Sequence, residues 1–574
     1  MPLPPLAAAL PPGALPWSPR SWGSKRHVWR PKLEEAGAAA PFPTTHPCLP
    51  PLVSFQDKAR WTSLGSASLS SNLLSEAAIG SLPAGLTLDA RERVALSTPM
   101  SPALAALASH APDRVAARTA EGRRLRRQAL KGAVVVFVTA GYSGKRFIFE
   151  RAAELGVRSI VLDGPDSWAQ TLVGEGIVER FVPVDFSDAD GVLDAALAAL
   201  ATAKRDVGEI DGVVTFCELA VPLVSRLAER LGLPGNSPAS VDAARDKSAT
   251  RRVMEEAGLP NPRSFLIESI DQLDAAGSHV GFPAVVKPIH GAASIGVVRV
   301  NDAAALRAAY GRVQKEMASA TIVAGALQQG KAGGGEEGGD GAPADPSTAA
   351  WIKTTLMLEE YLDGPEVDVD LVFSEGAPVY GAVTDNWPTV EPYFNETGSN
   401  CPSILPADTQ AALVDLAVRS VHALGFAMGA FHVELKATAR GPRLIEVNCR
   451  MGGGPVQATN LLVWGVDLVE EHLMTAAGIP SRPPASARPL AFVAEYSINA
   501  KKSGSITHAG FVDAWTDHPD VLYARPLVAA GDRVTCVDDG MPTWVAELMV
   551  AKPTVEAAIE FVQQIEASVV VPVE

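Results

Sequence analysis

The chain has 574 residues, 47% of them hydrophobic, and a formal net charge of −16. This length predicts roughly four domains, and the composition is typical of a soluble globular protein. The acidic balance argues against a nucleic-acid-binding protein, which needs clustered lysine and arginine, and no uncharged apolar run approaches the roughly 18 residues of a membrane span.

Five cysteines are scattered singly along the chain. Their number is odd, and no CxxC pair is present. This pattern predicts reduced thiols rather than a disulfide framework or a zinc site.

Residues 1–33 differ in composition from the rest. They are rich in proline and alanine, carry five basic residues and contain no aspartate or glutamate. A basic, acid-free start resembles an organelle transit peptide, with a disordered tail as the alternative, so the expected location is cytoplasmic or organellar. The whole segment 1–125 shows no periodic pattern and is expected to be disordered or a linker.

Regular structure is predicted from residue 130. AVVVFVT (133–139) is an unbroken β-rich run, typical of a parallel strand buried on both faces, and SIVLD (159–163) is the next strand. The intervening GYSGKR turn and a helix complete a βαβ unit. Its glycines permit a dinucleotide-binding turn, but without a third glycine the pattern favours a tight strand-to-helix turn.

A lysine and a loop of small residues follow in FPAVVKPIHGAASIGVVRV (282–300). The first strand ends at Lys287, and the loop lets backbone N–H groups approach a phosphate. The stretch is not a Walker A motif, because GxxxxGK[ST] is absent. Taken alone, a hairpin with a solvated lysine is the simpler interpretation.

The stretch LEEYLDGPE (358–366) joins two predicted strands. We expect the first to be an edge strand whose backbone can pair with an adenine edge, while Glu366 accepts hydrogen bonds from ribose hydroxyls. The alternative is a charged edge that prevents aggregation. Just before it, the Gly-rich segment 330–349 cannot bury enough apolar surface to fold, so we expect a dispensable disordered insertion.

AFHVELKATARGPRLIEVNCR (430–450) predicts a hairpin that turns near Arg440. Glu434 and Glu446 would then face each other, and Asn448 would point to the same face as Glu446. Bare carboxylates so close would repel one another, and an all-oxygen set suits Mg²⁺ or Mn²⁺. Arg450 would offer its guanidinium to a phosphate or carboxylate there. A surface hairpin with stray acids is the alternative.

Taken in order, Lys247, Lys287 with HGAASIG, LEEYLDGPE, HVE and IEVNCR resemble the ATP-grasp ligases. The stretches TDNWPTVEPYFNETGSNCPSILP (384–406) and EVNCRMGGG (446–454) resemble those of carnosine synthases and bacterial L-amino-acid ligases. Cys449 departs from this pattern, because a smaller residue such as alanine is expected there. A nucleophilic role for Cys449 is disfavoured, because no histidine is placed nearby in the sequence to activate it.

The resemblance implies an α/β fold of the ATP-grasp type. A doubly wound N-terminal α/β domain would cover 130–240, and the ATP-grasp domain 241–480 would contain a small lid at about 262–361 and a central mixed-sheet catalytic part. A C-terminal subdomain would cover 485–574. Related enzymes often form homodimers, so a homodimer stays open.

The resemblance also implies roles for individual residues. The metal ligands would be Glu434, Glu446 and Asn448. Arg450 would stabilise the transferring phosphoryl group, and Glu396 would bind the amino group of a substrate. The nucleotide would be bound by Lys247, Lys287, Ser294, Glu359, Glu360, Tyr361, Leu362 and Glu366.

The implied reaction is ATP- and Mg²⁺-dependent joining of two small amino acids through an acyl phosphate, with release of ADP and phosphate. One alternative is a carboxylase-type enzyme that phosphorylates bicarbonate, against which the absence of a biotin-carrier-like segment counts. Another is a nucleotide-binding regulator without catalysis, which the complete set of metal and arginine residues argues against.

Overall fold

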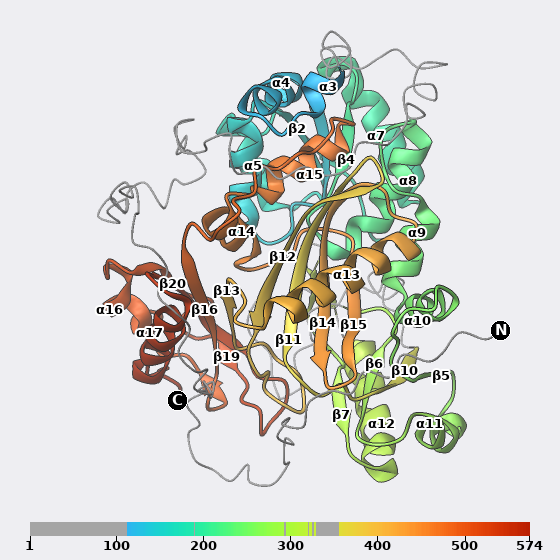
Figure 1. Ribbon diagram of the computed structural model, residues 1–574, viewed down its shortest axis with the longest axis vertical. Helices are drawn as coiled ribbons and strands as arrows, with labels where there is room; N and C mark the ends of the chain where they lie inside the picture. The colour runs from blue at the N-terminus through green and yellow to red at the C-terminus, as the bar shows by residue number, and fades with distance from the viewer. Residues whose placement is uncertain (1–111, 189, 292–293, 320, 324–325, 329–354) are drawn as a thin grey trace, which may run out of the picture. The chain divides into compact units, whose positions relative to one another are not determined.

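The computed structural model describes residues 112–574 except 189, 292–293, 320, 324–325 and 329–354 (Figure 1). The predicted insertion 330–349 and the basic start of the chain lie outside these residues. Within the described ranges, no helix is both long and apolar enough to span a membrane. The four described cysteines, Cys217, Cys401, Cys449 and Cys536, are buried free thiols.

Two helices begin inside the segment 1–125, for which the sequence predicts no regular structure, and the second continues to Leu130. They are α3 (Pro112–Ala116) and α4 (Ala120–Leu130). Arg126 fixes them, because its guanidinium is buried and donates to the carbonyl oxygens of Val115 and Ala117 at 2.7 and 2.9 Å. The arginine-rich sequence of α4 hides this role, since a buried arginine cannot be distinguished by pattern from its exposed neighbours.

The N-terminal domain is the predicted doubly wound unit (Figure 1). Its parallel sheet has the order β3-β2-β1-β4. The strands are β1 (Val134–Val138), β2 (Arg158–Asp163), β3 (Arg180–Pro183) and β4 (Gly212–Val214). The main helices are α5 (Arg146–Glu154), α7 (Val192–Val207) and α8 (Val221–Leu231). β1 is buried at every position because apolar clusters cover both faces of the sheet.

The turn after β1 is tight, as its glycines predict. Gly141 has φ +70, and a Cβ there would lie 2.8 Å from Cys217 Sγ. Thr139 also adopts a positive φ, of 59°. The close approach of the β4 loop therefore requires the glycine.

The segment predicted to be a lid, called the lid below, contains a four-stranded antiparallel sheet of order β5-β10-β6-β7. Its strands are β5 (Ser264–Ile267), β6 (Ala284–Pro288), β7 (Val298–Val300) and β10 (Leu356–Glu360), and its helices are α11 (Leu273–Val280) and α12 (Ala303–Ser319). A hairpin of β8 (Thr321–Val323) and β9 (Ala326–Gln328) follows α12. The prediction that 358–360 lie in an edge strand is wrong, because β10 pairs with both β5 and β6. Its buried run LMLE has neighbours on both sides, and the chain leaves the sheet only after Glu360.

One eight-stranded sheet runs through the central and C-terminal parts, in the order β15-β14-β11-β12-β13-β16-β20-β18. The strands are β11 (Glu366–Ser374), β12 (Ala377–Asn386), β13 (Gly398–Cys401), β14 (Gly429–Thr438), β15 (Gly441–Asn448), β16 (Phe492–Asn499), β18 (Val521–Pro526) and β20 (Trp544–Lys552). All its pairs are antiparallel, so parallel and antiparallel strands occupy separate sheets rather than one mixed sheet.

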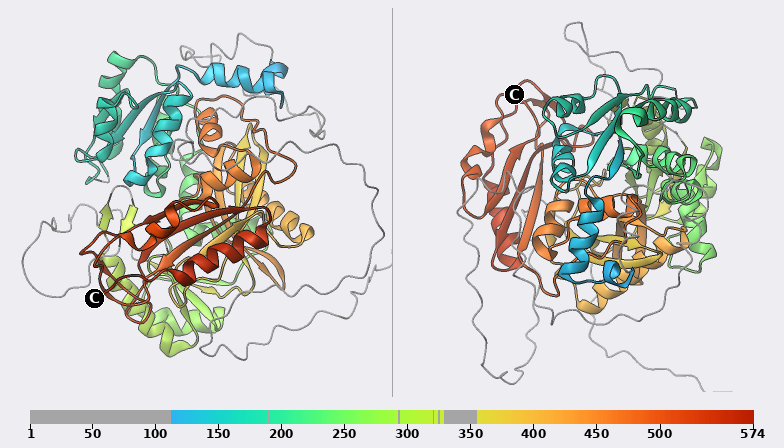
Figure 2. Two further views of the ribbon diagram at one scale, coloured as in Figure 1. Left: turned by 90° about the vertical axis from the view of Figure 1, so that its left-hand side faces the viewer. Right: turned by 90° about the horizontal axis from the view of Figure 1, so that it is seen from above.

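Helices cover this sheet. They are α13 (Ala407–Ala423), α14 (Val456–Trp464), α15 (Leu468–Ala476) and α17 (Val555–Ser568), the last packed on β16 and β20 (Figure 2). The predicted C-terminal subdomain therefore extends the eight-stranded sheet and shares its backbone hydrogen bonds. Two short elements complete this part: α16 (Asp513–Thr516), and the strand pair of β17 (Gly504–Ser505) and β19 (Arg533–Val534).

A buried ion cluster ties α15 to the N-terminal domain. The Glu470 side chain is 0% exposed and contacts Arg123 and Arg127 of α4 and Arg151 of α5. Asp467, which caps α15, accepts a further hydrogen bond from Arg151 at 2.6 Å. These ion pairs act beside an apolar contact, because one hydrophobic cluster runs from the N-terminal domain into α15 and the central sheet.

Candidate active site

A single cavity between the lid and the central sheet gathers most of the predicted residues. It is lined by Lys247, Val285, Lys287, Pro288, Gly291, Ser294, Ile295, Val297, Glu359, Glu360, Tyr361, Leu362, Glu366, Phe394, Glu396, Glu434, Lys436, Ile445 and Glu446. Of the predicted site residues, Asn448 and Arg450 are not in this lining. Segments 200 residues apart in sequence therefore meet at one place.

Lys287 lies at the end of β6, and an acid from β10 holds it. Its Nζ is 2.6 Å from Glu359 Oε1, and both residues are buried. Burial lowers the pKa of Lys287 despite this contact. Burial also opposes ionisation of Glu359, but the charges of Arg251 and Lys287 outweigh it and lower its pKa. Glu359 is thus an ionised anchor for Lys287, a contact the sequence did not predict.

Arg251 is a residue of the cavity region for which the sequence predicts no role. It lies on α10 (Lys247–Glu256), is 3% exposed, and donates to both Glu359 oxygens at 2.6 and 3.1 Å. The same guanidinium donates to the carbonyl oxygen of Ile445 at 2.6 Å. It therefore links the lid strand β10 to β15 of the central sheet. The sequence RRVMEE indicates this contact only weakly, because the polar face of a helix usually faces solvent.

Two features lie on the side of the cavity that is predicted to bind phosphates. Lys247 is the first residue of α10, and its backbone N–H donates to the Ile289 carbonyl oxygen at 3.0 Å, joining the helix to the end of β6. Ser294 adopts φ 55°, a strained conformation for a residue other than glycine. Non-glycine residues held in this region cluster at ligand sites, because the surrounding structure must maintain them.

The remaining nucleotide-side acids are engaged in ion pairs. Glu360 contacts Arg440 at 2.6 Å, and Glu366 contacts Lys436 at 3.3 Å. Tyr361 donates its hydroxyl to Glu391 at 2.9 Å; burial and this carboxylate raise the pKa of Tyr361 to about 12. The contacts of Glu360, Tyr361 and Glu366 with adenine and ribose stay predictions.

A β-bulge brings the two predicted metal-binding glutamates face to face. Leu435 pairs with Leu444. Regular pairing would next place Glu434 opposite Ile445, but the ladder shifts by one residue and opposes Glu434 to Glu446. Both Ile445 and Glu446 line the cavity, as expected where a bulge re-aims side chains.

The two facing carboxyl groups differ in charge. Burial and the charges of Glu446 and Asp368 hold the pKa of Glu434 well above its usual range. Burial also disfavours charge on Glu446, but its ion pair with Lys247 outweighs this and lowers its pKa to about 2. Such a pair fits a divalent cation, which would relieve the repulsion between two ionised carboxylates.

Asn448 completes this set but presents its nitrogen. Its Nδ2 donates to Glu434 and Glu446 at 3.1 Å each, while its Oδ1 accepts from Arg450 at 3.2 Å. A 180° rotation of the amide group would exchange Nδ2 and Oδ1 and place the oxygen beside the two carboxyl groups. Among the described residues, no group of three or more Asp, Glu, His or Cys side chains could hold a metal ion, so the predicted site would need the Asn448 amide oxygen as a ligand.

Arg450 is held by an acid from the N-terminal domain. Its Nε lies 2.8 Å from Glu218 Oε2, and Arg245 contacts the other oxygen of Glu218 at 3.0 Å. Glu218 follows β4 in the sequence CELA, which gives no sign of this function. The N-terminal domain thus orients the arginine predicted to act on the phosphoryl group.

Beside the metal set lies a buried histidine that sequence reasoning also missed. His432 Nδ1 is 2.8 Å from Asp370 Oδ1, and its Nε2 is 3.6 Å from Asp368 Oδ2. Burial disfavours its charge, but the two aspartates outweigh it and raise the pKa of His432 to about 10. Asn460 donates to the other Asp370 oxygen at 2.7 Å. The alternating sequence EVDVD, aligned against HVE, is the signal that could have revealed this network.

Glu396 lines the cavity from the loop before β13. Desolvation by the walls, with repulsion from Asp368 and Glu366, raises the pKa of Glu396 to about 7. Cys449 is buried and its pKa is raised to about 12, mainly by that burial, which agrees with an unreactive thiol.

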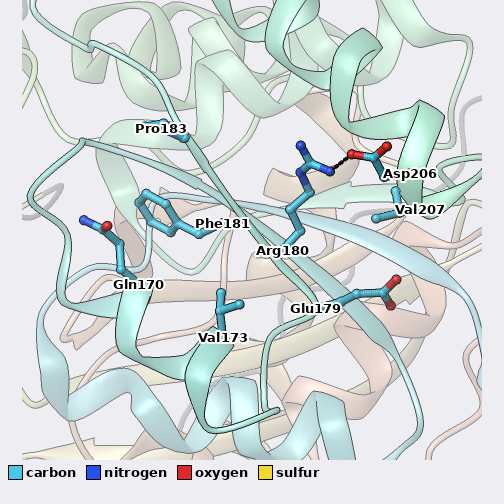
Figure 3. A pocket seen from close by; sticks show the side chains of 8 residues that line it. All are labelled: Gln170, Val173, Glu179, Arg180, Phe181, Pro183, Asp206 and Val207. Carbon is cyan, nitrogen blue, oxygen red and sulfur yellow. Dashed lines mark hydrogen bonds and ion pairs between the residues drawn. The ribbon is translucent and has the colours of Figure 1, made fainter.

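A second pocket, of about 580 Å³, lies at the β3 edge of the N-terminal sheet (Figure 3). Its charged side chains already have partners: Arg180 pairs with Asp206, and Glu179 accepts from Arg158 Nε at 2.7 Å. None of the predicted site residues lines it. Its satisfied charges offer little to a ligand, so we assign it no function.

Comparisons with known proteins agree with this geometry. A family described as the ATP-grasp N-terminal domain matches residues 149–235, and one described as the ATP-grasp domain matches 345–458. The chain is 31% identical over 431 residues to carnosine synthase 1 of Gallus gallus, covering 72% of this chain and 43% of that protein. It is 28% identical over 269 residues to alanine–anticapsin ligase of Bacillus subtilis, covering 46% of this chain and 52% of that one.

Among solved structures, an L-amino acid ligase from Bacillus licheniformis superposes with a TM-score of 0.62. It is 22% identical and covers 77% of this chain and 99% of that one. This likeness shows the fold. The chain spans less than half the length of the carnosine synthase that it matches.

Proposed function

Because this chain is an ATP-grasp protein, we propose that it is an ATP-dependent carboxylate–amine ligase that joins two small amino acids. One observation carries the proposal. The cavity combines the lysines and backbone groups expected of a nucleotide site with two facing carboxyl groups, and Glu396 lines it from a separate loop. A nucleotide-binding module alone has no need of Glu396. The names of two relatives, carnosine synthase 1 and alanine–anticapsin ligase, support the same class.

In the proposed complex, Lys247 and Lys287 bind the phosphates of ATP, and Ser294 belongs to the loop that covers them. The segment Glu359–Leu362 borders adenine, and Glu366 borders the ribose. Glu434, Glu446 and Asn448 would hold Mg²⁺ or Mn²⁺, which offsets charge on the phosphates when bound.

The proposed reaction has two steps. A carboxylate oxygen of one amino acid attacks the γ-phosphorus of ATP, the bond to the β-phosphate oxygen breaks, and an acyl phosphate and ADP form. The amine of the second amino acid then attacks the acyl carbon, loses a proton and expels phosphate, which leaves an amide. The protein supplies mainly position and electrostatic stabilisation.

Arg450 would stabilise this chemistry. A guanidinium offers two parallel donors to a phosphoryl or acyl phosphate group. Its contact with Glu218 fixes its direction before substrates arrive, which reduces the entropy lost in the reaction. Glu396 would accept the ammonium group of a substrate.

The test is ADP and phosphate release screened over pairs of amino acids, including β-alanine with histidine, with products identified by mass. Dependence on two amino acids supports the proposal. ADP release that depends on bicarbonate instead would overturn it and favour a carboxylase-type enzyme.

The variant Glu446→Gln should abolish turnover and leave the fold intact, because it removes a metal-binding charge without changing shape. The exposed Glu256→Gln on α10 is the matched control and should retain activity. Full activity of the Glu446 variant would refute the assignment of the metal site.

A further inference from the structure

The loop between β12 and β13, residues 387–397, carries Glu396 into the cavity and is held from two sides. On the lid side, Arg299 of β7 contacts Glu391 at 2.6 Å, and its backbone N–H donates to the Pro392 carbonyl oxygen at 3.1 Å. Tyr361 donates to the same Glu391. The lid therefore fixes the first half of the loop.

The C-terminal sheet holds the second half, and it does so at Glu396 itself. The Glu396 carbonyl oxygen accepts from Trp544 Nε1 at 3.0 Å and from Asn499 Nδ2 at 2.9 Å. Both donors come from the C-terminal segment, more than 100 residues further along the chain. The main chain of Glu396 is thus fixed while its carboxyl group remains free to line the cavity.

A register shift creates this pair of donors. β16 and β20 pair regularly as far as Ile498 with Ala546, and the next pair is Asn499 with Trp544. Val545 is the extra residue. Without the shift Asn499 would lie opposite Val545, so the bulge is what brings the indole N–H and the amide to one acceptor.

The neighbouring residue strengthens the contact. Asn395 is 1% exposed and donates to the Pro542 carbonyl oxygen at 2.9 Å and to Asn499 Oδ1. Phe394, which lines the cavity, has φ 55°. A residue other than glycine adopts this conformation only where its surroundings enforce it, and the anchored Asn395 and Glu396 supply that constraint.

We infer that Asn499 and Trp544 are positioning residues for Glu396, so that the C-terminal segment sets the binding of the substrate's amino group. The inference rests on the proposed function, because it takes Glu396 as the acceptor of that ammonium. It gives the C-terminal segment a part in amino-acid binding that is separate from ATP binding.

The test uses Trp544→Phe, which removes the indole N–H and keeps an aromatic ring, and Asn499→Leu, which keeps volume and removes the donor. Each should raise KM for the amino acid about two- to tenfold, the effect of one lost hydrogen bond, and leave KM for ATP unchanged. The control is Trp515→Phe, in the same part of the chain, whose ring packs on Phe561. Equal shifts in both KM values would overturn the inference.

A double-mutant cycle separates this inference from the proposed function. Glu396→Gln should itself raise KM for the amino acid, and Trp544→Phe should add nothing in that background, because it acts through Glu396. If Glu396→Gln leaves KM unchanged, the proposed role of Glu396 fails. If it raises KM but Trp544→Phe acts equally in both backgrounds, only the positioning inference fails.

Discussion

Replacing Glu470 by glutamine should destabilise the protein by about 3–5 kcal/mol, the cost of breaking a buried ion pair from one side. Glu470 is the shared acceptor of the buried cluster that joins α15 to the N-terminal domain. Arg127 Nε donates to it at 2.6 Å, and nitrogens of Arg123 and Arg151 lie 3.3 Å away. Glutamine has nearly the same shape as glutamate but no charge, so the three arginines would lose the carboxylate that neutralises them.

The pKa of Glu470 gives a second route to this magnitude. Burial disfavours its charge, but the hydrogen bond from Arg127 and the nearby arginines lower its pKa to about 2. An unfolded glutamate titrates near 4.3, so the lowered pKa of Glu470 corresponds to about 3 kcal/mol of stability. Because the folded pKa is the lower one, this stability is present above about pH 5 and is lost as the pH falls toward 2.

Urea unfolding at pH 7 and at several values down to pH 3 measures both effects. The Glu470 variant should unfold at lower urea at pH 7 and should lose less stability than the wild type on acidification. Glu154→Gln is the control, because Glu154 pairs with the same Arg151 at the surface and should cost less than about 1 kcal/mol. A Glu470 variant with wild-type stability at pH 7 would refute the argument.

Two further predictions concern the candidate active site. Glu359→Gln should weaken ATP binding about tenfold in equilibrium titrations, because it releases Lys287 and Arg251 from their shared carboxylate; unchanged affinity would show that the anchor is dispensable. Glu218→Gln should lower kcat by up to about 100-fold with KM for ATP unchanged, because Arg450 loses its orienting partner; a wild-type kcat would contradict that role.

Much of the site could be predicted because its residues occur in short local patterns. A hairpin with an acid on each arm predicts their pairing, and the structure opposes Glu434 and Glu446. The N-terminal sheet follows from its unbroken apolar strands, and its parallel order confirms the doubly wound prediction. For the hairpin and for the first βαβ unit, the sequence pattern lies within about 30 residues.

What could not be predicted depends on contacts between distant segments. Glu218 and Arg450 are 232 positions apart, and only the packing of the N-terminal domain brings them together. β10 looked like an edge strand because its partners β5 and β6 precede it by many residues. Hydrophobic pattern reports which face of a strand is buried, but not which strand lies beside it.

The bulge at Ile445 has a consequence for how such hairpins vary. With a two-residue turn, Thr438 pairs with Gly441, and undistorted partners are always separated by an odd number of positions. Glu434 and Glu446 are twelve positions apart, an even number. They can face each other across a two-residue turn only because the bulge adds one residue to β15. The tip can therefore lengthen by one residue on each arm without disturbing the acids, whereas a single added residue on one arm turns one of them toward the core. Parity of spacing, taken together with the length of the turn, thus shows whether a facing pair of acids requires such an irregularity.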